Sequence, residues 1–477
     1  MLVQISRWLL SIEDWLRPFT RERLIFWGSV VLFAMVSKAP WYHLPEETLN
    51  AFGINLKSIL LLKGFTLAAV AAGAIALLLD TQRLSRFFAW QAFGIILLTP
   101  YLLATWVSGL DAVTTNLYAQ NQQITRHVEH NLPTVQAQWK RNIPLLPDRT
   151  TPLTLGLTIP DSRFFQASSW DYFLLEGLGY RNSVLGFIGK GWILSLVLLV
   201  WLLIGLYVRL PNTSEIWWDL RWLVPYWGSL LTLISLSILA VNVLNVQLDT
   251  WLVSGNYPKV ITTSQRVATW YPNFQCDETF QTRLAHAEFY QGHPHSARIA
   301  LATGIERYQR GEYGRAIEYL RQALEQDPHA CLARIYLAIA LLNSAVDYFE
   351  TPILPNRPSE HRLPSQANFL DSPKARQGHL RAKPAGAIHQ LEQVLEVFPG
   401  HLEALYNLML THSINGNFDQ SAVVAQRLVE IQQNFQQPNT ALLGQVYTHF
   451  AWEEYHNQNL NQAWERYRQS VDPSRWP

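Results

Sequence analysis

Two histidine pairs have the spacing that best suits metal chemistry in this sequence. His127 and His130 are three residues apart, so a helix would place them on one face, as two metal ligands require. His293 and His295 flank Pro294 in a turn. Neither pair has an obvious carboxylate or cysteine partner to complete a coordination shell. We therefore interpret both pairs as solvated surface histidines and expect no metal site.

Motifs that would indicate an enzyme are missing from the sequence. It contains no nucleotide-binding glycine loop, nucleophile elbow, HExxH helix or CxxC pair. Two carboxylates, Glu46 and Glu47, follow the first apolar segment and resemble acidic residues of polyprenyl-phosphate-sugar transferases. The resemblance implies lipid-linked sugar transfer, but those enzymes use many more spanning helices. We expect no catalytic residues, no enzymatic activity and no cofactor.

The two cysteines leave two alternatives open. Cys276 and Cys331 both lie in the polar half of the chain. They would form one disulfide if that half faces an oxidising compartment. Otherwise they are free thiols, which commonly pack as small buried hydrophobic groups.

Composition divides the 477 residues into two unlike halves. Leu, Ile, Val and Trp dominate before Val253, whereas Gln, Glu, Arg, His and Ala dominate after Thr262. The net charge is +1, and no basic tract with interleaved aromatic residues is present. This balance disfavours a nucleic-acid partner.

The first half contains apolar segments long enough to be membrane spans, since a spanning helix needs roughly 20 mostly apolar residues. Polar segments separate them, and no small-residue cleavage site follows the first one, so it does not fit a cleaved signal peptide. About five spans are expected, at Leu24–Pro40, Ser58–Leu79, Phe87–Leu110, Gly191–Val208 and Trp222–Leu244.

Arginines in alternate loops predict the orientation of these spans. They precede the first span, separate spans two and three, and separate spans four and five. The positive-inside rule makes these three segments cytoplasmic. An odd number of spans then places the C-terminal half outside the cytoplasm, in the periplasm of a bacterium. The prediction is a multi-pass inner-membrane protein with a cytoplasmic N-terminus.

Two further segments adjoin the predicted spans. Residues 1–23 carry apolar residues at helical spacing opposite polar ones, which is typical of a helix lying in the membrane interface. Residues 111–183 begin with a Gln-rich stretch that we interpret as a helix extending span three. Prolines and an aromatic run follow, so we expect a small extracytoplasmic subdomain there.

The second half contains an internal repeat. In a 34-residue unit counted from Ala297, small and apolar residues recur at fixed positions: Gly304, Gly311, Tyr313, Ala316, Leu320, Ala323 and Pro328. This pattern resembles the tetratricopeptide family closely. The resemblance implies pairs of antiparallel helices, A and B, stacked into an α-solenoid.

Further units extend this repeat domain over residues 249–477. The second unit starts at Cys331 and is interrupted by a proline-rich insertion at 350–384 before it resumes at Ala387. A third unit starts at Leu402, and a weaker fourth starts at Gly444. Gly255, Tyr257, Val260, Val267 and Pro272 match helix B of a further unit, whose helix A would be the outer end of the last span. The predicted domains are therefore 1–23, 24–110, 111–183, 184–248 and 249–477, and the fold class is all-α.

The resemblance also implies a binding groove, because certain helix A positions line the concave face in the tetratricopeptide family. Aromatic and arginine side chains there are typical interface anchors. The alternative is that some of these side chains pack against the insertion or the preceding helices. Transferred to this sequence, the groove residues are Arg298, Leu301, Ile305, Tyr308, Ile335, Ile339, Tyr406, Leu410, Trp452 and Tyr455.

These features predict a non-enzymatic, membrane-anchored scaffold that binds a protein or peptide partner and organises a membrane complex. A second hypothesis is a structural component of a cell–cell junction or channel. The membrane half is similar in topology to cyanobacterial filament-integrity proteins of septal junctions, most visibly in residues 170–192. The sequence leaves the partner, the pathway and the homo- or hetero-oligomeric state open.

Overall fold

The computed structural model describes residues 21–122 with gaps at 56 and 80, 186–207, and 213–350 with a gap at 294–295. It also describes residue 124, residues 387–435 with a gap at 415–416, and 443–471 with several gaps. Within these residues all regular elements are helices, which confirms the all-α prediction, and the one β-type contact is an isolated bridge between Tyr42 and Ile188.

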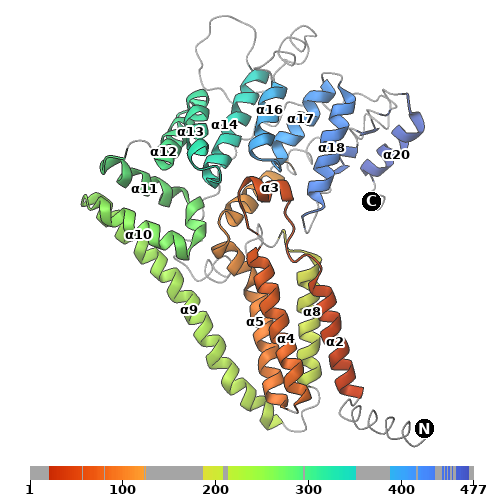
Figure 1. Cartoon of the computed structure of the whole chain (residues 1–477). Coiled ribbons are helices and arrows are strands. Elements are labelled where there is room, and N and C mark those ends of the chain that lie inside the picture. Colours follow the sequence, from red (N-terminus) through yellow and green to blue (C-terminus); the bar gives the residue numbers. More distant parts are fainter. Residues whose placement is uncertain are drawn as a thin grey trace, which may run out of the picture.

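Four helices of the first half lie side by side as a bundle (Figure 1). Among the described residues, four helices are long and apolar enough to cross a membrane, and three of them, α4, α5 and α8, belong to this bundle. The fourth bundle helix, α2, has 17 residues and packs against α4 and α8. The bounds are α2 Arg21–Ser37, α4 Lys57–Leu78, α5 Gln82–Trp106 and α8 Lys190–Tyr207.

The bundle turns apolar side chains outward as well as inward. Leu60, Phe65 and Trp201 are 60% or more exposed on its surface, where a water-soluble protein would carry polar groups. Small residues allow close packing inside. A Cβ atom at Gly73 of α4 would lie 3.3 Å from the carbonyl oxygen of Ser85 at the start of α5.

At one end of the bundle, two loops are joined by backbone hydrogen bonds. The amide of His43 donates to the carbonyl of Phe187 (2.8 Å), and the amide of Gly189 donates to the carbonyl of Trp41 (2.8 Å). Because the backbones are so close, a Cβ atom at Gly189 would lie 2.3 Å from the Pro40 carbonyl oxygen. This close packing requires a glycine at position 189, which lies within the stretch 170–192 that is similar to junction proteins.

At the opposite end, a buried ion pair joins α5 to the long helix α9 (Thr213–Val253). Arg86 Nε lies 2.6 Å from Asp219 Oδ2, and the two side chains are 2% and 16% exposed. Tyr207 of α8 donates its hydroxyl hydrogen to the same carboxylate oxygen (3.0 Å), and Trp90 donates to the Tyr207 oxygen (3.0 Å). Arg86, which lies between the second and third predicted spans in the sequence, is therefore buried and links α5 to α8 and α9.

Helix α9 continues from the apolar region into the second half as one helix of 41 residues. It ends at Val253, and Gly255 (φ +76°) turns the chain into α10 (Tyr257–Trp270). Its outer end contacts α11 (Glu278–Tyr290), where the Arg283 guanidinium is 2.7 Å from Asp249 and 3.2 Å from Asn245. No linker separates this helix from the repeats, in agreement with the expected helix A at the end of the last span.

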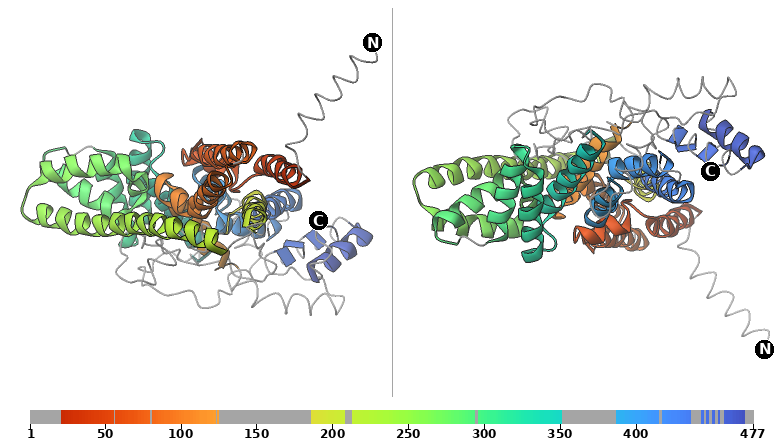
Figure 2. Two further views of the ribbon diagram at one scale, coloured as in Figure 1. Left: turned by 90° about the horizontal axis from the view of Figure 1, so that it is seen from below. Right: turned by 90° about the horizontal axis from the view of Figure 1, so that it is seen from above.

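The repeat helices follow one another in a row across the end of the bundle (Figure 2). Inside the first unit, a Cβ atom at Gly304 would lie 2.7 Å from Leu320 Cγ, so only glycine allows helices A and B to approach this closely. Ala316 and Leu320 are completely buried in that seam. The remaining elements are η3 Pro272–Cys276, α12 Ala297–Gln309, α13 Tyr313–Gln326, α14 Cys331–Glu350, α16 Ala387–Val397, α17 Leu402–Ile414, α18 Phe418–Gln432 and α20 Leu460–Val471.

Some expectations fall on residues that the structure does not describe. They are residues 1–20 of the proposed interfacial helix, His127 and His130, most of the subdomain at 111–183, and the insertion at 350–384 beyond Glu350. His295, Trp452 and Tyr455 also lie outside the described residues.

Candidate functional site

The helix A face of the repeats is covered by a segment of the same chain. After α5 the backbone turns at Gly109 (φ +80°) and forms a helix over residues 110–122. Leu110, Val113 and Leu117 of this helix are completely buried. They belong to one hydrophobic cluster with the helix A residues of the second and third units. We refer to this helix as the covering helix.

Most of the predicted groove residues that the structure describes are buried in the same hydrophobic cluster as the covering helix. None of the following is more than 5% exposed: Leu301, Ile305, Ile335, Ile339, Tyr406 and Leu410. These side chains are therefore part of the protein core. The alternative named above, packing against the insertion or the preceding helices, differs from this arrangement in that the cluster includes the covering helix. Binding of a foreign partner at these residues stays a prediction.

Two predicted groove residues are partly exposed. The Arg298 guanidinium contacts Glu288 Oε1 at 2.5 Å, so its charge is already paired within the chain. Tyr308 accepts a hydrogen bond from Asn343 (3.2 Å), and its ring lies 5.6 Å from the ring of Tyr336. Burial raises the pKa of Tyr308 more than the hydrogen bond lowers it, so the hydroxyl stays protonated. Neither side chain is a free anchor.

Polar residues of the covering helix fix its position on the third unit. Gln120 accepts a hydrogen bond from the amide of Leu402 (2.8 Å), one of the N–H groups at the start of α17 that have no partner inside the helix. Asn121 accepts from the Gln432 side chain (3.0 Å). Each of these side chains is no more than 9% exposed. Such buried bonds specify the position of the helix, because losing one partner leaves an unsatisfied polar group.

A completely buried histidine lies beside this contact. His401 accepts a hydrogen bond from the amide of Ala404 at its Nδ1 atom (3.3 Å), and its ring lies edge-on to Phe398 at 5.3 Å between centroids. Burial lowers the pKa of His401 to about 3, so the ring is neutral at ordinary pH.

Helix α3 (Glu46–Ala51) lies between the bundle and the repeats (Figure 1). The Glu47 carboxylate contacts the Arg427 guanidinium of α18 at 2.5 Å, and Phe52 meets Phe398 edge-on at 4.9 Å. Thr48 packs so closely on Gly400 that a Cβ atom there would lie 2.5 Å from its hydroxyl oxygen. Glu47, one of the two carboxylates compared with sugar transferases, therefore joins the segment between α2 and α4 to the third unit.

The two cysteines form a disulfide. It links η3 to the start of α14, with the two Cα atoms 5.7 Å apart. A cavity of about 300 Å³ beside it is lined partly by Arg298 and Leu301. The disulfide also contacts the base of the covering helix, since a Cβ atom at Gly109 would lie 3.4 Å from Cys276 Sγ. Of the two alternatives for the cysteines, the structure has the disulfide.

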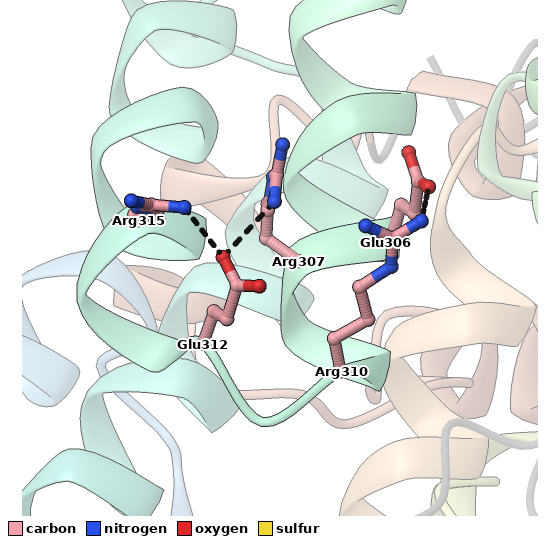
Figure 3. A network of polar contacts seen from close by, with 5 residues as sticks. All are labelled: Glu306, Arg307, Arg310, Glu312 and Arg315. Atoms are coloured by element: carbon pink, nitrogen blue, oxygen red, sulfur yellow. Dashed lines mark hydrogen bonds and ion pairs between the residues drawn. The ribbon is translucent and has the colours of Figure 1, made fainter.

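The turn of the first unit carries a network of surface ion pairs (Figure 3). Glu312 accepts hydrogen bonds from Arg307 of helix A (3.0 Å) and Arg315 of helix B (3.1 Å). Desolvation alone would raise the pKa of Glu312, but the two guanidinium groups outweigh it and lower the pKa. Arg310 pairs with Glu306 on the same helix. These exposed pairs hold the turn and leave no acidic group free for chemistry.

An open groove lies on another side of the repeats, between α16, α18 and the fourth unit. It has a volume of about 940 Å³. Apolar side chains from the second, third and fourth units line it, including Leu395, Leu408 and Phe450. Glutamates stand among them, and we name this site the acidic groove. It is lined in addition by Glu47, Glu392, Glu396, Leu405, Ala422, Val423, Val424, Gln426, Arg427, Glu430 and Arg466.

Sequence reasoning missed both the covering helix and the acidic groove. The signal for the first was the spacing of Leu110, Val113 and Leu117, which places three apolar residues on one helix face just beyond a span. The signal for the second was a pair of glutamates, Glu392 and Glu396, one helical turn apart. Among the described residues, no group of three or more His, Cys, Asp and Glu side chains has an arrangement that would hold a metal ion.

Stacked helix pairs next to long apolar helices define the class of protein: a helical-repeat protein with helices long and apolar enough to cross a membrane. The sequence comparison agrees for the repeats. Residues 301–347, from α12 to α14, match the tetratricopeptide repeat family. The C-terminal half therefore contains tetratricopeptide repeats. A comparison with curated proteins gave no match.

Proposed function

We propose that the protein is a membrane-anchored scaffold whose tetratricopeptide domain holds a protein partner on the outer side of a bacterial inner membrane. The observation that carries the proposal is the continuity of α9, which is one helix of 41 residues from the apolar region into the repeats. Tetratricopeptide repeats are modules for protein binding. A repeat domain without a flexible linker would present its partner at a fixed place relative to the membrane.

Three observations support the orientation. The disulfide between Cys276 and Cys331 suits an oxidising compartment. The N-terminal parts of α2, α5 and α9, which carry Arg21, Arg83 and Arg221, lie at the end of the bundle away from the repeats. The 17 residues of α2 span roughly 26 Å at 1.5 Å per residue, near the thickness of the hydrocarbon core, so α2 counts as the fifth span.

Reporter fusions test this topology. An alkaline phosphatase fused after Pro477 is expected to be active, because the enzyme folds only outside the cytoplasm. The matched control is a fusion at Arg83, between α4 and α5, which is expected to be inactive. Inactivity at Pro477 together with activity at Arg83 would reverse the proposed orientation.

Crosslinking in native membranes tests the scaffold itself. The full-length protein, purified after crosslinking, is expected to retain one partner in a constant ratio. Migration of the wild-type protein as a lone chain in a native gel would contradict the proposal, as would catalytic turnover by the purified protein alone.

The other two hypotheses have their own tests. A junction protein concentrates at septa in a fluorescence image, whereas a general scaffold spreads around the envelope. A sugar transferase would lose activity with Glu46→Gln and Glu47→Gln. The contact of Glu47 with Arg427 gives that carboxylate a structural role instead.

A further inference from the structure

The acidic groove is a concave surface that the described part of the chain leaves open. The predicted groove residues of helix A are buried, whereas the groove between α16 and α18 holds about 940 Å³ of accessible space. Val423 stands in it with 65% of its side chain exposed. Nearby Leu405, Leu408 and Val424 are buried at 8% exposure or less, and they form an apolar floor.

The negative charges of the groove are not neutralised within the described part of the chain. Glu392 and Glu396 lie one turn apart on α16, are exposed, and form no ion pair with any described residue. The Glu430 carboxylate on α18 accepts a side-chain amide hydrogen bond from Gln426 (3.3 Å) and forms no ion pair among the described residues. Three carboxylates from two helices therefore face solvent around an apolar floor.

The two arginines of the groove are already engaged. Arg427 contacts Glu47 at 2.5 Å and donates to the Pro399 carbonyl at 3.0 Å. Arg466 stacks over the Phe450 ring at 5.4 Å. The charge that remains for an incoming ligand is negative. It would repel anionic lipids and nucleic acids and attract a cation, since complementary charge steers association and selects partners.

We propose that the acidic groove binds a segment of the partner protein that carries Lys or Arg side chains on both sides of apolar residues. The apolar residues of this segment contact Val423 and the floor, and its cationic groups pair with Glu392, Glu396 and Glu430. The volume suits a short segment rather than a whole domain. This inference rests on the proposed scaffold function and names the chemistry of its partner.

A labelled peptide of defined chemistry tests the inference. The probe is a fluorescent 12-residue peptide of lysines and leucines arranged on opposite faces of a helix. Its binding to the full-length protein, held in nanodiscs of uncharged-headgroup phosphatidylcholine, is followed by fluorescence anisotropy at low salt. A second peptide with glutamates in place of the lysines controls for apolar binding.

Two charge-reversal variants separate the groove from the overall charge of the protein. The first is Glu392→Lys with Glu396→Lys. The matched control is Glu318→Lys with Glu325→Lys on α13, where both glutamates are exposed and Glu325 occupies the repeat position of Glu396. Both variants change the net charge equally. Thermal melting of each checks that it is folded.

We expect the groove variant to weaken binding of the lysine peptide at least about tenfold, and the control variant less than twofold. Equal weakening in both variants would overturn the inference, because it would reflect long-range charge alone. Equally tight binding of the glutamate peptide to the wild type would also overturn it.

A native gel distinguishes failure of this inference from failure of the scaffold function. If the partner complex dissociates in the groove variant and survives in the control variant, the groove holds the partner. If the complex survives in both, the scaffold function stands and the groove inference fails. If the wild type itself forms no complex, the scaffold function fails.

Discussion

The repeat domain has two contrasting surfaces, the helix A face and the acidic groove. The helix A face is buried within the protein, whereas the acidic groove is open to solvent among the described residues. On the first, the predicted groove residues from Leu301 to Leu410 are buried in one hydrophobic cluster with residues of the covering helix. On the second, an apolar floor and three carboxylates face solvent. In the tetratricopeptide family the first surface is the expected binding site.

This difference shows what the repeat pattern determines. The consensus positions specify which residues face the concave side, because they set how helices A and B pack. They do not specify whether that side is free. Here the free surface has to be found from unpaired charges and exposed apolar side chains.

The largest expected effect is loss of packing on the covered face. Leu117→Ala removes a completely buried side chain, and we expect the free energy of unfolding to fall by about 2–5 kcal/mol. Val423→Ala in the open groove is the control, with an expected change within about 0.5 kcal/mol. Denaturant unfolding measures both. Similar values for the two variants would mean that the covering helix is not part of the core.

A smaller effect is expected when the polar contact is broken. Gln120→Ala leaves the Leu402 amide without its acceptor, which costs about 1–3 kcal/mol. The control is Gln426→Ala, at an exposed position of the groove, with little change expected. Hydrogen exchange of the α17 amides checks the mechanism, because protection should be lost at the start of that helix first. Unchanged protection would show that this bond does not hold the covering helix.

A pH dependence is expected from the covered face and not from the groove. The folded-state pKa of His401 is about 3 because the ring is buried, and the unfolded value is near 6.5. The unfolded chain therefore binds the proton first as pH falls below 6.5. Stability from this group is fully present above pH 6.5 and is lost by up to about 1.4 kcal/mol per pH unit as the pH falls towards 3.

His401→Asn tests this dependence, because asparagine keeps an acceptor for the Ala404 amide and does not titrate. We expect the loss of stability between pH 6.5 and pH 5 to be clearly smaller in this variant. His293→Asn, at an exposed histidine, is expected to retain the wild-type dependence. Parallel pH curves for wild type and His401→Asn would contradict the assignment.

The smallest effect on stability is expected in the acidic groove. Glu396→Gln removes an exposed charge without an ion pair, so thermal melting should shift by no more than the experimental error. The same variant should weaken binding of the lysine peptide. A marked loss of stability would show that Glu396 has a structural role and that the groove is not free.

Much of the fold was predictable because it follows from local patterns. The apolar windows predict long apolar helices, and the small residues at Gly304, Ala316 and Ala323 predict helix pairs through nearest-neighbour packing. The continuation of the last apolar helix into the second half was also expected from the sequence. Such features depend on residues close in sequence.

The candidate sites were harder to predict because they depend on contacts between distant segments. Gln120 and Leu402 are 282 positions apart, and nothing local marks them as partners. Arg86 lies in the sequence where a loop between two apolar segments is expected, yet it forms a buried ion pair with Asp219. The cysteine alternatives were open for the same reason, since only the fold brings residues 55 positions apart within bonding distance.

The length of α9 has a mechanical consequence. At 1.5 Å per residue, its 41 residues make a rod of roughly 62 Å. Pro225 lies near its inner end and removes one backbone hydrogen bond, which makes that point the natural pivot. The part of α9 from Pro225 to Val253 is roughly 42 Å long, so a tilt of about 5° there would move its far end by roughly 4 Å. A displacement of the repeat domain would thus be transmitted along α9 to Pro225 as a rotation.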